Sequence, residues 1–420
     1  MIIDNRKSTI ENLLLGIPMR TFAQTKVLLV IVVLSLILVS GCDNPKTGSL
    51  YDANATSLPQ PAITGVSPAG SAYAGMDTIV ITGTNFSTAL GDNSVLFNVT
   101  PAALLKATAT QITLKAPLVA LDSVAIRVSV FGSALFSNTY QYKLIAGMAK
   151  FGSFISAEAA TSLAVDATGN LYSGFSSNGL EAGVAKFTAA GARSVYAPAT
   201  AGVASWSGMK FGPGGFLYAA RNARAMYRFP ANGVGSGAVY QALPVGVFAY
   251  DFDFDQTGTM WIGGNNSSIY RLATDRTITT FPFVGQIRSM RVYNGYLYFS
   301  AKTDAGEKIW RAQISTSGLG TPEVYFDFGA AYPTNLALCI TFSSDGILYI
   351  GTDSPDGLLV VNPDKSFSAP YSAYIALYTP AINFLAWGAT NDLYASSSAG
   401  VLMKVTVRGK KSAPYFGSTL

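Results

Sequence analysis

The segment Tyr250–Asp255 alternates aromatic residues with three carboxylates, Asp251, Asp253 and Asp255. In a β-strand these carboxylates would lie on one face, because successive side chains point to opposite sides. Carboxylate oxygens are ligands that calcium prefers, but an EF-hand-like loop needs glycine after the third acid, and Gln256 stands there. The pattern therefore permits calcium without indicating it, and we predict no cofactor and no resident metal.

The chain contains no histidine and only two cysteines, Cys42 and Cys339. The absence of histidine removes the commonest general base, the commonest zinc ligand and every Ser-His or Cys-His dyad. Cys339 lies among Leu336, Leu338 and Ile340, a setting that favours a small buried hydrophobe over a nucleophile. Because no catalytic constellation is complete, we predict that the protein is not an enzyme.

An apolar run, 27–39, leads into Val39-Ser40-Gly41-Cys42, which is the order of parts in a signal peptide. At about 1.5 Å per residue the run spans only about 20 Å, less than the hydrocarbon core of about 30 Å. A cleaved segment therefore fits better than a retained anchor or a buried helix. Val39-Ser40-Gly41-Cys42 resembles the lipobox of bacterial lipoproteins, which implies lipid on Cys42 and removal of residues 1–41.

Asp4 and Glu11 interrupt the start of this signal, whereas Met19 opens one of ordinary length, so we predict Met19 as the true start. Residues 42–60 lack apolar periodicity and are predicted to form a flexible tether. Cleavage before Cys42 would remove four of the 28 basic and two of the 23 acidic residues, which leaves a net charge of about +3. Without a Lys/Arg cluster, this balance argues against nucleic acid as a partner.

Short extended segments separated by turn residues run from Pro61 to Leu144 and predict a small β-sandwich. The segment 61–144 resembles the IPT/TIG family of immunoglobulin-like domains. The resemblance rests on Pro61-Ala62-Ile63, Val66-Ser67-Pro68, Gly75, Ile81-Thr82-Gly83-Thr84-Asn85-Phe86, Thr110-Gln111-Ile112-Thr113, Ala116-Pro117, Tyr140 and Tyr142. Gly83 and Asn85 are expected to adopt positive φ. The family implies a spacer or interaction domain, with direct ligand binding as the alternative.

A self-similar unit repeats six times after Gly147, and such repetition is the strongest sequence signal of fold. Each unit carries an apolar-aromatic pair at the start of its second strand: Leu171-Tyr172, Leu217-Tyr218, Met260-Trp261, Leu297-Tyr298, Leu348-Tyr349 and Leu393-Tyr394. Four strands at a period of about 45 residues define propeller blades, whereas β-solenoid units are nearer roughly 20 to 30. We predict an all-β chain: a small immunoglobulin-like β-sandwich followed by a six-bladed β-propeller at 148–420.

Closure of the ring is less constrained by the sequence. Pro414-Tyr415-Phe416 matches the fourth strands of other units and is predicted to be the fourth strand of the last one. Residues 148–155 then form either a linker strand or an added edge.

The repeats resemble the six-bladed propellers of the NHL-repeat and lactonase-like superfamily. In lactonase-like members Glu, Asn and Asp from different blades hold a divalent metal. The resemblance therefore implies an alternative function, a metal-dependent lactonase-like or other hydrolase at the mouth of the channel. Asp251 and Asn383 match part of that ligand set, but no glutamate on an inner strand completes it.

Aligning the six units on their pairs places a polar and aromatic rim near the channel mouth. Its members, the candidate ligand-binding residues, are Trp206, Tyr250, Asp251, Arg288 and Asn383. The competing interpretation is that they finish turns and satisfy backbone groups. The same alignment gives Lys210 and Arg291 the place of Asp253 in the flanking units, which favours ion pairing between blades over a metal site.

These features predict a lipid-anchored, non-catalytic binding or interaction protein of the cell envelope that presents its propeller to a protein or glycan partner. A structural component of an envelope assembly is a further alternative. An NHL-type propeller joined to an IPT/TIG module is similar to outer-membrane and surface lipoproteins, so we expect the outer membrane, on its periplasmic or surface face.

Overall fold

The computed structural model describes residues 56–416, apart from 201–203, 232, 234, 266, 379–380, 389–390 and 398. Its helices and strands all belong to one compact unit, Leu58–Leu420. The predicted signal peptide, Cys42 and most of the tether lie outside the described residues. No helix in the described part of the chain is both long and apolar enough to cross a membrane.

The first domain is a sandwich of two sheets. One sheet has the order β1-β3-β7-β6 and the other β2-β9-β8-β4-β5, and all their pairings are antiparallel except β2 with β9. The strands are β1 (Ala62–Ser67), β2 (Ser71–Tyr73), β3 (Thr78–Thr84), β4 (Asn93–Phe97), β5 (Thr100–Pro101), β6 (Leu104–Ala107), β7 (Gln111–Lys115), β8 (Leu121–Val130) and β9 (Tyr140–Ile145), with a 3-10 turn, η1 (Leu90–Asp92). Alternate residues of β3, β4, β7 and β8 point inward and form one apolar core.

The Gly-Thr-Asn-Phe turn after β3 is shaped by two different constraints. Asn85 has φ 59°, as predicted for a residue that tolerates the left-handed region. Gly83 instead lies in the extended strand β3, which corrects the prediction of positive φ. A Cβ on Gly83 would lie 2.0 Å from the carbonyl oxygen of Ala62 and 2.4 Å from the Phe86 ring, so glycine is required by close approach rather than by φ.

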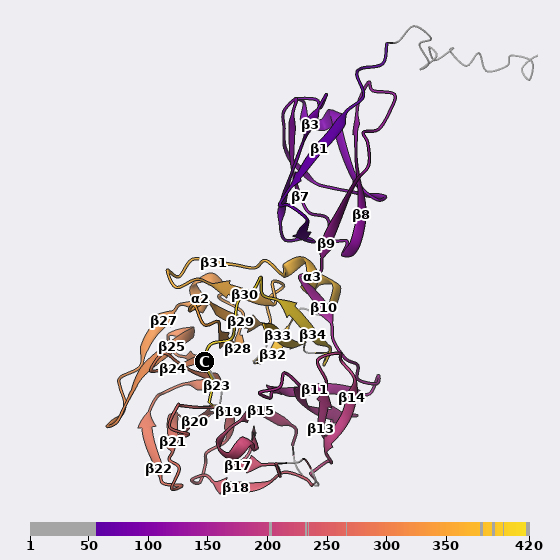
Figure 1. The fold of residues 1–420 in the computed structure, drawn as a ribbon. Coiled ribbons are helices and arrows are strands. Elements are labelled where there is room, and N and C mark those ends of the chain that lie inside the picture. The colour runs from indigo at the N-terminus through magenta and orange to yellow at the C-terminus, as the bar shows by residue number, and fades with distance from the viewer. Residues whose placement is uncertain are drawn as a thin grey trace, which may run out of the picture. The chain divides into compact units, whose positions relative to one another are not determined.

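The remaining strands form six sheets that radiate from a common centre (Figure 1). Blade 1 comprises β11 (Glu158–Val165), β12 (Leu171–Ser177), β13 (Leu180–Phe187) and β14 (Arg193–Ala197). Blade 2 comprises β15 (Trp206–Phe211), β16 (Leu217–Arg221), β17 (Ala225–Arg228) and β18 (Ala238–Ala242). Blade 3 comprises β19 (Ala249–Phe254), β20 (Met260–Gly264), β21 (Ser268–Leu272) and β22 (Ile278–Pro282). A short 3-10 turn, η2 (Pro213–Gly215), joins β15 to β16.

Blade 4 comprises β23 (Gln286–Tyr293), β24 (Tyr296–Thr303) and β25 (Gly306–Ser315), with β26 (Gly318–Leu319) and β27 (Glu323–Phe326) both paired to β25. Blade 5 comprises β28 (Ala337–Phe342), β29 (Leu348–Thr352), β30 (Leu358–Val361) and β31 (Phe367–Ser368). Blade 6 has β32 (Ile382–Trp387), β33 (Asp392–Ser397) and β34 (Leu402–Thr406), and two short helices, α2 (Phe328–Ala331) and α3 (Ser372–Tyr378), lie in connections. The first strands of the blades contact one another in order, and β11 also contacts β32, so the ring is closed.

The six apolar-aromatic pairs lie where the repeats predict, at or next to the start of each second strand. All six aromatic side chains are buried: Tyr172, Tyr218, Trp261, Tyr298, Tyr349 and Tyr394. Tyr218, for example, contacts Phe254 on the inner strand of blade 3 at 5.1 Å between ring centroids. The repeated aromatic therefore packs one blade against the next, and this packing accounts for its recurrence.

The ring is closed by a strand from the opposite end of the propeller sequence. β10 (Met148–Lys150) pairs antiparallel with β34 and is the outermost strand of blade 6. This resolves the two alternatives for 148–155 in favour of an added edge. It also corrects the prediction that Pro414-Tyr415-Phe416 is the fourth strand of the last blade: those three residues belong to no strand.

Candidate functional site

Every inner strand of the propeller contains a β-bulge at the same place. The register shifts lie between Ala160 and Ser162, Trp206 and Gly208, Ala249 and Asp251, Ile287 and Ser289, Ala337 and Cys339, and Ile382 and Phe384. A bulge leaves one residue unpaired and turns its side chain away from the ladder. The six residues in the bulges, all half-buried, are Thr161, Ser207, Tyr250, Arg288, Leu338 and Asn383.

This repeated bulge explains which predicted rim residues share a site. Tyr250, Arg288 and Asn383 occupy the bulge in blades 3, 4 and 6, and Arg288 and Asn383 line one cavity together with Asp251. Trp206 precedes its bulge and is 1% exposed. Its Nε1 donates to Oε1 of Glu181 at 3.0 Å, so Trp206 is corrected from a rim residue to a core residue.

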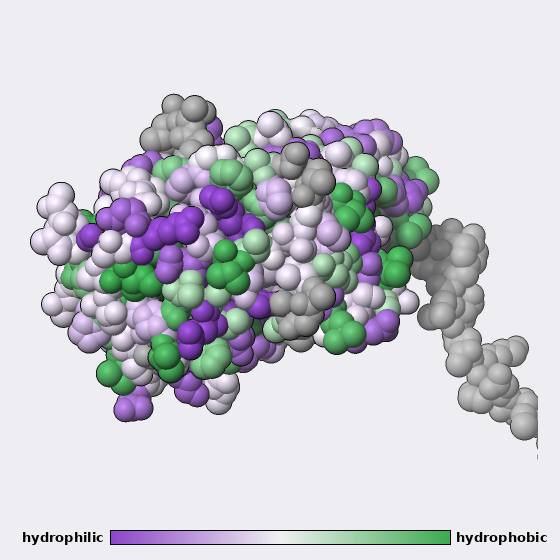
Figure 2. Space-filling model, turned by 90° about the horizontal axis from the view of Figure 1, so that it is seen from below, coloured by the Kyte–Doolittle hydropathy of each residue, from purple (hydrophilic) through white to green (hydrophobic). Residues whose placement is uncertain are grey.

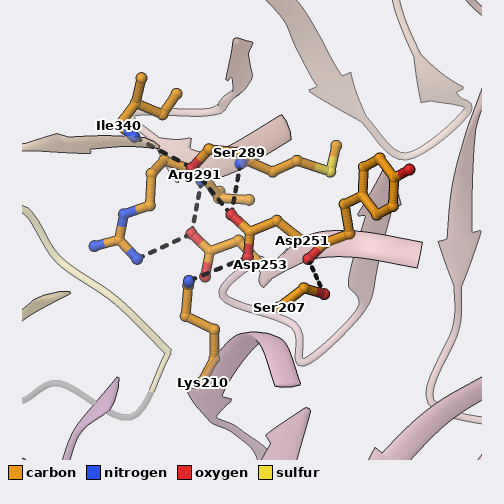
Figure 3. A network of polar contacts seen from close by, with 10 residues as sticks. Ser207, Lys210, Asp251, Asp253, Ser289, Arg291 and Ile340 are labelled. Atoms are coloured by element: carbon orange, nitrogen blue, oxygen red, sulfur yellow. Dashed lines mark hydrogen bonds and ion pairs between the residues drawn. The ribbon is translucent and has the colours of Figure 1, made fainter. Parts of the chain in front are cut away.

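Asp251 and Asp253 lie on the inner strand of blade 3 and are both buried. The Asp251 carboxylate accepts hydrogen bonds from the Ser289 hydroxyl at 3.0 Å and from the N–H of Met290 at 2.9 Å. Its other oxygen lies 3.5 Å from Nζ of Lys210 in blade 2. Figure 3 shows this network converging on blade 3 from both neighbouring blades.

Asp253 is held in the same way by blade 4. Its Oδ2 accepts from Nη1 of Arg291 at 3.3 Å and from the N–H of Val292 at 2.8 Å. The prediction of ion pairing between blades is therefore confirmed for both carboxylates, although Lys210 pairs with Asp251 rather than with Asp253. These contacts join the inner strands of blades 2, 3 and 4 to one another.

Asp255 does not join the other two carboxylates. It lies in the turn after β19, where its Oδ1 accepts from the N–H of Thr257 at 2.9 Å and its Oδ2 accepts from Nε1 of Trp261 at 3.0 Å. Asp166 closes the equivalent turn of blade 1 with the same kind of bond to the N–H of Thr168 at 2.9 Å. The predicted row of three carboxylates on one face is therefore reduced to two, and Asp255 is a turn residue.

The channel mouth contains a buried ion pair that the sequence did not indicate. Nη1 of Arg288 donates to both oxygens of Glu307 at 2.8 and 2.9 Å, and the N–H of Ala337 donates to the same carboxylate at 3.3 Å. Burial raises the pKa of Glu307 above its usual value, against the opposing effect of Arg288. Glu307 follows a turn of blade 4, and no spacing in the repeats relates it to Arg288.

The other end of the channel is lined by the C-terminal segment. Tyr415 and Phe416 line a cavity with Lys210, Asp253 and Arg291, and the N–H of Ala413 donates to the carbonyl of Phe342 at 3.0 Å. The two channel cavities have volumes of about 40 and 30 Å³. Since one water needs at least about 10–15 Å³ by this measure, they accommodate a few waters and exclude a sugar-sized substrate.

The lactonase-type metal set does not fit these residues. Asp251 and Asn383 line the same cavity, but the Asp251 oxygens are occupied by Lys210, Ser289 and a backbone N–H, and Glu307 is held by Arg288. Among the described residues, no group of three or more His, Cys, Asp or Glu side chains is placed to hold a metal ion. Cys339, near Asp251, is 5% exposed, and burial raises its thiol pKa, which disfavours the thiolate that a nucleophile or ligand needs.

Comparison with known proteins supports the two-part architecture. Residues 61–144 match the IPT/TIG domain family, so this part of the chain is an IPT/TIG domain. No curated protein matches the chain. A putative phosphatase from Bacteroides thetaiotaomicron is similar in structure, with TM-score 0.53 and 11% identity over 83% of this chain and 97% of that one.

Two further structures were found by the same comparison. A putative gluconolactonase has TM-score 0.50 and 14% identity over 64% of this chain and 94% of its own. An auxiliary nutrient binding protein from Bacteroides thetaiotaomicron has TM-score 0.48 and 10% identity over 86% of this chain and 99% of its own. At 11% and 14% identity the likeness to the phosphatase and to the gluconolactonase shows the fold alone.

Proposed function

We propose that this chain is a lipid-anchored, non-catalytic binding protein of the cell envelope, in which the propeller presents its outer surface to a protein or glycan partner. The observation that carries the proposal is the state of the channel. Each charged side chain that was a candidate for chemistry there is neutralised by a neighbouring side chain: Asp251 by Lys210, Asp253 by Arg291, and Arg288 by Glu307.

Such a network joins neighbouring blades and leaves these charged groups without free valence for a substrate. A buried carboxylate that already accepts a cation and backbone N–H groups has few lone pairs left for a metal or a proton transfer. The channel cavities are also smaller than the roughly 300 Å³ at which ligand pockets begin. Binding is therefore expected on the outer surface, where polar and apolar side chains are interspersed on the face drawn in Figure 2.

The hydrolase alternative is tested with D-glucono-1,5-lactone as the probe, with and without added calcium or zinc. We expect the mature chain to hydrolyse it no faster than buffer containing the same metal. Saturable, metal-dependent hydrolysis by the wild type that disappears in Asp251→Asn would overturn the proposal. Asp364→Asn, in an exposed turn of blade 5, is the matched control.

A binding role is tested by affinity capture from native envelopes with the anchor intact. We expect a glycan or protein to be retained equally well by the wild type and by Asp251→Asn, because the channel carboxylate does not face the partner. Recovery only of fixed, stoichiometric envelope subunits would instead favour the structural-assembly alternative.

The anchor is part of the proposal and is tested separately. Radioactive fatty acid should label the wild type and not Cys42→Ala, and the labelled protein should fractionate with the outer membrane. Label that survives in Cys42→Ala would exclude lipid on this cysteine.

A further inference from the structure

Blades 2 and 4 carry the same set of aromatic and cationic residues at the same places. In each blade an aromatic residue comes directly before the apolar-aromatic pair of the second strand. An arginine of the third strand lies opposite the buried tyrosine of that pair, and the fourth strand contributes a second tyrosine. The corresponding residues are Phe216 and Tyr296, Arg228 and Arg311, Tyr218 and Tyr298, and Tyr240 and Tyr325. The two tyrosines of each blade contact edge to face, at 5.1 Å and 86° in blade 2 and 5.0 Å and 86° in blade 4.

A second cation reaches each set from the next blade. In blade 2 the Arg228 guanidinium lies 4.3 Å from the Phe216 ring centroid and 5.1 Å from that of Tyr240. Arg276, from the turn between β21 and β22, lies 4.7 Å from the Tyr240 ring. Lys365 takes the same place in blade 4, 3.0 Å from the Tyr325 ring centroid, and both turn residues have positive φ, 71° and 74°.

Beyond the exchange of Phe216 for Tyr296 and of Arg276 for Lys365, which keeps the ring and the positive charge, the two sets differ in the anion. In blade 4 the residue opposite Arg311 is Glu323, and Nε of Arg311 donates to its carboxylate at 2.7 Å. In blade 2 the residue opposite Arg228 is Ala238. Within the described part of the chain, neither Arg228 nor Arg276 forms an ion pair with a carboxylate, whereas the equivalent arginine in blade 4 does.

A cavity lies beside Arg228 and Ala238, where the carboxylate of Glu323 lies in blade 4. This cavity of about 350 Å³ lies over blade 2 and is lined by Phe216, Arg228, Ser236, Val239, Tyr240 and Arg276; we call it the blade 2 pocket. Its volume is ample for a ligand larger than a bare carboxylate. Planar guanidinium groups bind carboxylates through paired hydrogen bonds, and the aromatic walls with a serine hydroxyl suit the apolar faces and hydroxyl groups of a sugar.

We propose that the blade 2 pocket binds an acidic sugar, a uronic acid residue of a glycan, and that its carboxylate takes the place that Glu323 has in blade 4. The inference rests on the proposed binding function and adds a ligand class and a site outside the channel. Arg228 and Arg276 hold the carboxylate, while Phe216, Tyr240 and Val239 form the wall against which the sugar ring packs.

Calorimetric titration of the mature chain tests this with a galacturonic acid trisaccharide as the probe and the neutral galactose trisaccharide beside it. We expect saturable binding of the acidic sugar that weakens with added salt, and no binding of the neutral one. Arg228→Gln should lower the affinity by about tenfold or more, as expected for loss of a charged hydrogen-bonding partner. Arg311→Gln, the same change in blade 4, should bind as the wild type does.

The most specific variant supplies the missing anion. Ala238→Glu recreates the Arg311–Glu323 arrangement in blade 2, so it should abolish acidic sugar binding while the thermal midpoint stays at or above the wild-type value. Undiminished binding by Ala238→Glu, or no preference of the wild type for the acidic sugar, would overturn the assignment of the pocket. Equal or tighter binding of triglutamate would overturn the sugar as the ligand.

These results are distinguishable from failure of the proposed function. Metal-dependent lactone hydrolysis would contradict the proposal that the chain is non-catalytic. It would not affect the titration of the blade 2 pocket, which tests sugar binding independently. If the wild type does not bind the trisaccharide, the inference about the blade 2 pocket is wrong. If the wild type and Ala238→Glu nevertheless capture the same envelope partner, the proposed binding function is still supported.

Discussion

Arg291 and Asp253 form a buried ion pair between the inner strands of blades 4 and 3, with 3.3 Å between Nη1 and Oδ2. Their side chains are only 10% and 6% exposed, and the N–H of Val292 donates to the same carboxylate oxygen. The blades belong to different sheets, so this pair supplies a polar link that no strand ladder provides.

Removing one partner of this pair should be more damaging than removing both. Asp253→Asn leaves the Arg291 charge buried without a counter-ion, and we expect the free energy of unfolding to fall by about 3 kcal/mol. The double variant Asp253→Leu/Arg291→Met should lose less than Asp253→Asn alone, because it buries no charge. Urea unfolding followed by tryptophan fluorescence measures both; a single variant as stable as the wild type would show that the pair is not structural.

A second pair gives the stability a defined dependence on pH. The Glu158 carboxylate accepts from Nη1 and Nη2 of Arg193 at 2.6 and 3.0 Å, and this hydrogen bonding is the main reason that its pKa lies below the usual 4.5. Because the folded-state pKa is lower than the unfolded one, the contribution to stability is complete above about pH 4.5 and is lost as the pH falls through the folded-state pKa.

We therefore expect Glu158→Gln to reduce the free energy of unfolding at pH 7 by about 1–2 kcal/mol, and the difference from the wild type to shrink as the pH is lowered toward 3. Chemical unfolding at a series of pH values checks this. The control is Glu323→Gln, whose pair with Arg311 is more exposed and should contribute less than about 1 kcal/mol. A gap between Glu158→Gln and wild type that stays constant down to pH 3 would contradict the linkage.

The fold was predictable from sequence wherever a repeated residue has a repeated physical task. The aromatic member of each apolar-aromatic pair, such as Tyr218, packs one blade against the next, so it recurs and reveals the period. Met148–Lys150 has no such signature. Its pairing with β34 joins segments about 250 residues apart, and a three-residue edge strand has too little pattern to be distinguished from a linker.

The candidate site was predictable only in part, because both bulges and strand ends change which side chains face the channel. Strict alternation would keep Asp255 with Asp251 and Asp253, but the strand ends at Phe254 and the last carboxylate closes a turn. Alignment of the units correctly related Arg291 to Asp253. It could not supply Glu307 as the partner of Arg288, since that contact depends on the path of a turn in the outer part of the blade.

The three-residue strand β10, which completes blade 6, can be tested by substitution of two neighbouring residues. Met148 is 1% exposed and packs in an apolar core shared by blades 5 and 6, whereas the neighbouring Ala149 is exposed. Met148→Asp should lower the free energy of unfolding by about 3 kcal/mol or more, because it buries an unpaired carboxylate. Ala149→Asp on the same strand is the control and should change stability by less than about 0.5 kcal/mol. Thermal unfolding of both variants decides whether β10 closes the ring.

The IPT/TIG domain contains a matched pair of glycines that separates steric need from backbone freedom. A Cβ on Gly83 would lie 2.0 Å from the Ala62 carbonyl oxygen, whereas one on Gly65 would meet nothing within 4 Å. Both glycines belong to the sheet that contains β1 and β3. Because the added methyl group would force these two strands apart, Gly83→Ala should lower the free energy of unfolding of the sandwich by about 2 kcal/mol or more. Gly65→Ala should be close to neutral.

Tryptophan fluorescence reports on the propeller alone, because all four tryptophans of the chain, at 206, 261, 310 and 387, belong to it. Tryptophan fluorescence of the folded state should be the same for Gly83→Ala and wild type, because all the tryptophans lie in the propeller, while hydrogen exchange of the β1 and β3 amides should be accelerated in Gly83→Ala alone. Accelerated exchange of the same amides in Gly65→Ala, to the extent seen in Gly83→Ala, would mean that loss of glycine flexibility and not the clash with Ala62 sets the requirement. Unchanged exchange in both variants would contradict the prediction, because the methyl group on residue 83 would then be accommodated without weakening the pairing of β1 with β3.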